Sequence, residues 1–121
     1  MMTTINSSPN WVTIPLWHSA SLVGFKGTIG LFRALLGGKT MFIGCSTTPT
    51  SGLGARLDAL RKPKGSGQRH FAGRQVFKHR MNIEMQIAVM DLPASRILQL
   101  RDELVEELRP PWRVPEKWYP R

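Results

Sequence analysis

The sequence GLFRALLGGKTMFIG, residues 30–44, contains two short apolar runs on either side of a Gly-Gly pair. Glycine adopts positive φ without steric cost, so Gly37-Gly38 suits the tight reversal between two antiparallel strands. We therefore predict a β-hairpin whose strands lie within residues 25–36 and 40–44.

Three further periodic segments follow the hairpin. Apolar residues recur at helical spacing in residues 53–61, and Pro63 ends that predicted helix. Alternation of apolar and polar residues predicts a third strand over residues 81–90, with a buried face formed by Met81, Ile83, Met85, Ile87 and Val89. A helix is predicted over residues 94–108, with an apolar stripe formed by Ile97, Leu98, Leu100, Leu104, Val105 and Leu108.

Two other segments are less regular. Residues 64–70 combine two glycines and a serine with cations, which is typical of a flexible loop. Residues 11–14 alternate like a strand, but Pro15 interrupts the run, so we expect an edge strand or an extended lead-in.

Taken in order, these segments resemble the GIY-YIG nuclease domain. The two tripeptides that name the family match Gly30-Leu31-Phe32 and Phe42-Ile43-Gly44, and its helical arginine matches Arg56. The closing helix and its proline-aromatic ending match the segment that runs up to Trp112. The resemblance covers residues 28–113 and rests on several short motifs in the right order.

The resemblance implies an α/β (α+β) fold with a small three-stranded antiparallel sheet flanked by helices. We assign residues 25–113 to this domain, residues 1–24 to an N-terminal tail and lead-in, and residues 114–121 to a C-terminal tail. A chain of 121 residues with 41% apolar residues is sufficient for one core.

The chain departs from the family pattern where the family does its chemistry. Both tyrosine positions hold phenylalanine, Phe32 and Phe42, while the metal-binding glutamate falls on Arg101 and the closing asparagine on Arg113. In the family the first tyrosine activates water, the glutamate holds a divalent metal and the arginine stabilises charge on the phosphate. A phenyl ring cannot accept a proton, and arginine repels a cation. We therefore predict no catalytic residue, no metal site and no cofactor.

These positions also have simpler interpretations. Phe32 and Phe42 are most simply core aromatics. Arg56 is either a phosphate contact or an ordinary surface cation, and Arg101 could pair with Asp102 or Glu106.

Positive charge is concentrated in one segment. The formal net charge is +9, and residues 56–80 contain eight Lys or Arg side chains but only one acid, Asp58. Such a segment attracts polyanions through phosphate contacts, so we predict DNA or another nucleic acid as partner. An acidic protein or a solvated loop is the alternative, whereas a membrane surface is disfavoured because the segment lacks an apolar stripe. The candidate contacts are Arg56, Arg61, Lys62, Lys64, Arg69, Arg74, Lys78, His79 and Arg80.

Two other functions stay open. A divergent endonuclease could use Mg²⁺ or Mn²⁺ held by a relocated acid, with His70 or His79 as base; the candidate acids are Glu84, Glu103, Glu106 and Glu107. An inhibitor from a phage or mobile element could bind a host complex that handles nucleic acid.

The sequence also bears on location. The single cysteine, Cys45, cannot form an internal disulfide, and the three histidines are spaced too irregularly for a zinc motif. There is no signal-peptide pattern and no apolar run of about 18 residues, so we expect a cytoplasmic protein.

Overall fold

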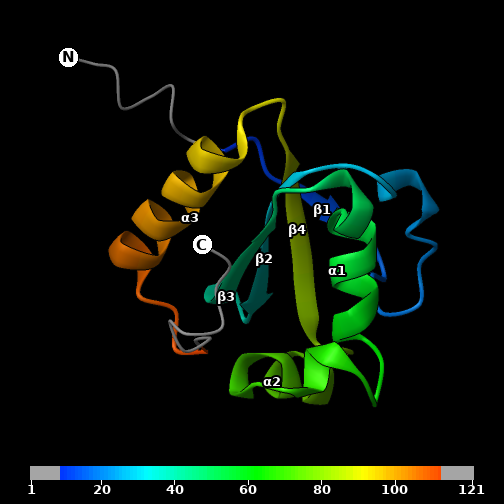
Figure 1. Ribbon diagram of the computed structural model, residues 1–121. Coiled ribbons are helices and arrows are strands. Elements are labelled where there is room, and N and C mark those ends of the chain that lie inside the picture. The colour runs from blue at the N-terminus through cyan, green and yellow to red at the C-terminus, as the bar shows by residue number, and fades with distance from the viewer. Residues whose placement is uncertain (1–8, 113–121) are drawn as a thin grey trace.

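The structure is a computed structural model that describes residues 9–112, and in this range a single antiparallel sheet lies between helices (Figure 1). The strands are β1 (Val12–Ile14), β2 (Gly30–Leu36), β3 (Lys39–Ser46) and β4 (Ile83–Val89). The α-helices are α1 (Leu53–Leu60), α2 (Phe71–Lys78) and α3 (Ala94–Leu108). Short 3-10 helices are η2 (Val23–Phe25), η3 (Pro49–Ser51) and η4 (Ser66–Gln68). The α+β class predicted from the sequence is confirmed.

The sheet has four strands within residues 9–112, in the order β1-β4-β2-β3, where three were predicted. The additional strand is β1, which pairs with β4 so that Thr13 lies opposite Gln86. Its edge position is the one in which the following Pro15 is tolerated, because no partner strand needs the missing N–H. The segment after β1 also joins the core: Trp17 is 1% exposed and its Nε1 donates to the Arg80 carbonyl at 3.2 Å.

The β2–β3 hairpin forms as predicted, with positive φ at both Gly37 and Gly38. Phe32 lies opposite Gly44 in the register, and its ring covers the glycine. A Cβ on Gly44 would lie 2.7 Å from Phe32 Cε2, which is closer than real Cβ contacts allow. The glycine is therefore required for the ring to occupy its place.

Helices cover both faces of the sheet, which gives two apolar clusters (Figure 1). One face packs against α1 and α2 and includes Phe32, Phe42 and Met85. The other face packs against α3 and includes Leu31 and Ala88. The alternation in β4 thus has apolar residues on both faces, because Ala88 is buried under α3.

The predicted buried face of residues 81–90 is correct only in its centre. Ile83, Met85 and Ile87 are buried, whereas Met81 and Val89 are 65% and 55% exposed. Met81 lies in the turn before β4, and Val89 is the last residue of that strand. On α3, whose bounds match the prediction, the exposed Leu108 is likewise the last residue.

Helix α2 was not predicted. It buries only small or short side chains, Ala72, Gly73 and Val76, so its sequence lacks the large apolar residues at helical spacing that mark α1 and α3. The His70 side chain begins the helix: Nδ1 accepts a hydrogen bond from the Gly73 N–H at 3.0 Å. Burial, followed by the charge of Arg74, lowers the pKa of His70 below its usual range.

We predict that Gly44→Ala destabilises the protein by about 1–3 kcal/mol, because the new methyl group displaces the Phe32 ring. Gly24→Ala is the control: nothing lies within 4 Å of the Cβ position, so its effect should stay within about 0.5 kcal/mol. Urea unfolding of both variants measures this. Equal stability of the two variants would show that the ring does not need the glycine.

The His70 cap predicts a pH dependence of stability. The folded-state pKa is lowered, so the unfolded chain binds the proton more readily, and the stabilisation is complete above the unfolded pKa of about 6.5. It decreases as the pH falls below that value. His70→Asn keeps a capping acceptor that does not titrate. Between pH 7.5 and 5.5 the wild type should therefore lose more unfolding free energy than His70→Asn, and parallel profiles would contradict this account.

Candidate functional site

The two positions that correspond to the family's tyrosines lie in the core. Phe32 and Phe42 are 4% and 5% exposed, and their rings meet edge to face with centroids 5.7 Å apart. This confirms the interpretation as core aromatics. Since neither ring carries a polar atom, these seats can neither accept nor donate a proton.

The position that corresponds to the family's metal-binding glutamate, the glutamate seat, is occupied by Arg101, whose guanidinium is buried. Arg101 is 4% exposed, and its Nε and Nη2 donate to Asp102 Oδ1 at 3.0 and 2.8 Å. Its Nη1 donates to the Cys45 thiol at 3.8 Å. The predicted pairing of Arg101 with Asp102 is thus present. The Arg101 guanidinium in this pair is buried, so the pair is not an ordinary surface ion pair.

The pKa of the Cys45 thiol depends on the charges near this position. Burial raises the pKa of the Cys45 thiol, while the positive charges of Arg101 and Arg56 oppose that rise. The two arginines lie on different helices, α3 and α1, yet both act on this one residue of β3. The seat that holds a cation in the family is therefore positively charged here.

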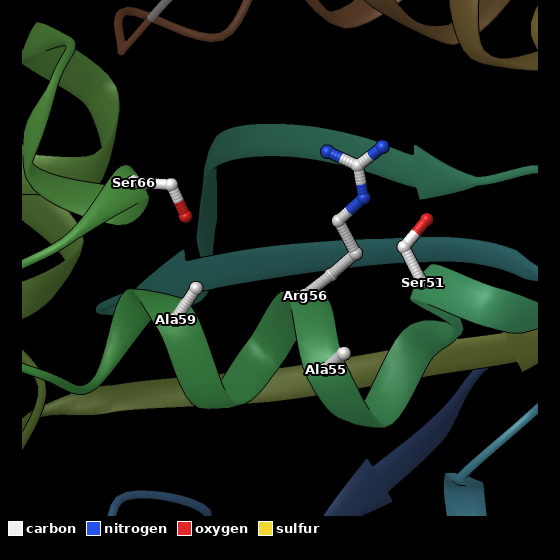
Figure 2. Close-up of a pocket in the computed structure, with 5 residues that line it drawn as sticks. All are labelled: Ser51, Ala55, Arg56, Ala59 and Ser66. Atoms are coloured by element: carbon white, nitrogen blue, oxygen red, sulfur yellow. The ribbon is translucent and has the colours of Figure 1, made fainter.

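Arg56 projects from α1 beside an open hollow of about 330 Å³ (Figure 2). Ala55 and Ala59 leave space next to the guanidinium, and Ser51 and Ser66 contribute hydroxyl groups. Within residues 9–112 the Arg56 side chain makes no hydrogen bond or ion pair with another side chain or carbonyl. Its donors are therefore available to an anion that enters the hollow.

Part of the predicted basic set is exposed. Lys64, Arg69 and Lys78 are exposed, as is Arg74, whose Nη1 donates to the Gln68 carbonyl at 3.2 Å. Lys62 is also exposed and pairs with Asp58 at 2.8 Å. Together with Arg56 these side chains lie on α1, on α2 and in the segment between the two helices. We name them the basic face: Arg56, Lys62, Lys64, Arg69, Arg74 and Lys78.

The other three members of the predicted set make interactions within the fold. Arg61 Nη1 donates to the carbonyls of Trp17 and Ala20 at 2.9 and 2.6 Å, which fixes the segment after β1 against α1. The His79 ring stacks on Trp112 with centroids 5.5 Å apart. The Arg80 guanidinium lies 4.1 Å from the centre of the Phe77 ring.

The candidate relocated acids lie on other surfaces. Glu84 accepts hydrogen bonds from Thr13 and Gln86 at 2.6 and 2.8 Å beside β1, and the bond from Thr13 is the main cause of its lowered pKa. Glu103 accepts from Gln99, and Glu106 pairs with Arg109 at 2.8 Å. Glu107 is exposed on α3.

The donor set therefore does not fit the divalent metal that the fold family implies. A guanidinium occupies the glutamate seat, and no three His, Cys, Asp or Glu side chains of residues 9–112 converge as ligands. Arg113, at the asparagine seat, lies outside the described residues.

The candidate bases are also engaged. Neutral imidazole has one acceptor nitrogen, and in His70 the Gly73 N–H occupies it. His79 lies against Trp112. His70 therefore has no free acceptor nitrogen in its neutral form, and one face of the His79 ring is covered.

The sequence analysis missed the small residues around Arg56 and the aromatic exposed on α2. Phe71 is 48% exposed and directly follows the predicted loop. The spacing of Phe71, Arg74 and Lys78 at i, i+3 and i+7 was a signal that could have revealed an outward helical stripe. In the described part of the chain, no helix has the length and apolarity needed to cross a bilayer.

The sequence matches no protein-family model and no curated protein. Solved structures are similar in fold. The GIY-YIG N-terminal endonuclease domain of UvrC from Thermotoga maritima, as a tyrosine-to-phenylalanine point mutant bound to the catalytic divalent cation, is 16% identical with a TM-score of 0.57. That match covers 77% of this chain and 90% of the other.

A second structure of the same domain, bound to magnesium, is 14% identical, with a TM-score of 0.57 over 94% of this chain and 100% of the other. Identity this low supports a common fold and no more. The antiparallel sheet with flanking helices agrees with that likeness. This chain has a GIY-YIG-like fold.

Proposed function

We propose that this protein binds DNA or another nucleic acid through the basic face and does not hydrolyse it. The observation that carries the proposal is the exposure of six cations on α1, on α2 and in the segment between these helices, with Asp58 as the one acid of residues 56–80. Lys62 and Arg61 already pair with that carboxylate. The remaining cations are balanced by no neighbouring acid in this segment.

Charge separation across the molecule supports this orientation. Helix α3 lies on the other side of the sheet from α1 and exposes four of the chain's eight acids, namely Asp102, Glu103, Glu106 and Glu107 (Figure 1). Asp102 and Glu106 pair with Arg101 and Arg109, so this side has little excess positive charge, and a polyanion is attracted more strongly to the basic face. This asymmetry in charge favours binding of a polyanion in one orientation over non-specific binding to the whole surface.

The chemistry of the basic face suits phosphates. Guanidinium groups donate in a planar fork that matches phosphate oxygens, and lysines add compact charge. Arg56, with the open hollow and two serine hydroxyls beside it, is the best-placed single contact. Such contacts position a nucleic acid without reading its sequence.

Hydrolysis is disfavoured by the residues in the site. Attack on a phosphodiester needs an activated water and stabilisation of the developing charge. Arg56 can supply the second, but the buried phenylalanines and the buried Arg101 cannot supply the first. No observation favours a relocated acid, because Glu84, Glu103 and Glu106 lie near β1 or on α3 and make local contacts.

We predict that affinity for duplex DNA falls linearly with salt on a log-log plot, by roughly 0.9 per phosphate neutralised. Arg69→Ala with Arg74→Ala should weaken binding to all sequences and lower the slope by about one unit for each lost contact. The control removes the same charge from α3, Arg96→Ala with Arg109→Ala, and should leave the slope unchanged. Fluorescence anisotropy over a salt series measures both.

Equal losses in the two double variants would mean that net charge, and not the basic face, governs binding. An absence of binding at low salt would reject the nucleic-acid proposal and point to a protein partner.

We also predict that the purified protein does not nick plasmid or branched DNA with Mg²⁺ or Mn²⁺, because no water-activating group lies at the site. Gel analysis over a range of protein concentrations checks this. Nicking that a chelator abolishes, and that Glu103→Gln or Glu106→Gln weakens, would contradict the prediction and favour a divergent nuclease.

A further inference from the structure

We infer that α2 is a stacking platform for unpaired bases, with Phe71 as the ring that receives a base. This inference rests on the proposed function and specifies the form of DNA that the basic face prefers. It begins from an exposed aromatic whose position neither the core nor the nuclease chemistry explains.

Phe71 differs from the other four phenylalanines of the chain. Phe32 and Phe42 are core residues, Phe25 is partly covered, and Phe77 lies under the Arg80 guanidinium. Phe71 alone is exposed, with 48% of its surface accessible. The stabilisation that burial of an aromatic ring gives is therefore available to a ligand that covers Phe71.

The ring belongs to an ordered stripe. Phe71, Arg74 and Lys78 are exposed at i, i+3 and i+7, whereas Ala72 and Val76 face the core. At about 100° per residue the three exposed side chains lie on one side of the helix. The stripe therefore presents one aromatic ring in line with two phosphate-binding cations.

The platform is held in place at the end where the ring lies. His70 caps the first turn through the Gly73 N–H, so Phe71 follows a fixed residue. Gly73 packs directly against the Gly67 carbonyl, where any side chain would clash. Because the backbone at Phe71 is fixed before binding, stacking of a base needs to order only the side chain.

The combination of ring and cations selects for unpaired bases. Base stacking on an aromatic side chain needs an accessible base face, which single strands offer and an intact duplex hides. The cations contact phosphates on either kind of DNA. We therefore expect Phe71 to contribute to single-strand binding and to contribute little to duplex binding.

The test compares Phe71→Ala with Phe71→Tyr, which retains the ring, on a single-stranded oligonucleotide and on the duplex of the same sequence. Phe71→Ala should weaken single-strand binding by roughly tenfold and duplex binding by less than about twofold, while Phe71→Tyr stays near wild type. The salt slope should not change, because no phosphate contact is lost. Circular dichroism confirms that the variants fold.

Each other result has a distinct meaning. Equal weakening of both DNA forms, or no effect of Phe71→Ala, overturns the stacking inference while the basic face remains a DNA-binding surface. A lowered salt slope in Phe71→Ala also overturns it, because the loss is then electrostatic. Absence of binding to both forms by the wild type rejects the proposed function itself, and the inference with it.

Discussion

The packing of the Phe32 ring on Gly44 is the contact on which the rest of the fold depends. It fixes the register of β2 against β3, because the ring fills the space that a side chain at position 44 would take. The same ring meets Phe42 and forms part of the cluster under α1 and α2. A phenyl ring makes these contacts as well as a phenol does, so the scaffold needs the ring and not the hydroxyl.

On the opposite face, Arg101 sets a second constraint. Burying a guanidinium costs free energy that only close partners offset, and here Asp102 and the Cys45 thiol provide them. A carboxylate in the same place could recruit a cation, whereas a guanidinium has no acceptor atom with which to do so. Arg101 of α3 thus makes this side of the sheet unsuitable for binding a metal cation.

The sequence predicted those parts of the fold whose signals are local. Helix α3 has a strong apolar stripe, and the hairpin has a glycine pair at its turn, so both were located. Helix α2 was missed because it buries only small residues. Residues 11–14 were expected as either an edge strand or an extended lead-in, because so short a segment gives little periodicity, and in the structure they contain the edge strand β1. The basic segment was found by its composition. The role of Arg61 could not be found in that way, since its partners Trp17 and Ala20 lie some forty residues away in the sequence.

The replacement at the glutamate seat separates attraction of phosphate from its cleavage. A metal ion bound by a carboxylate brings positive charge together with open coordination positions, where water is made acidic enough to attack. The Arg101 guanidinium brings positive charge but has no coordination position. Its charge and that of Arg56 oppose the rise that burial causes in the pKa of Cys45, whereas Asp102 adds to that rise. In the function we propose, such a site attracts a phosphodiester backbone without supplying the water-derived nucleophile that would cut it.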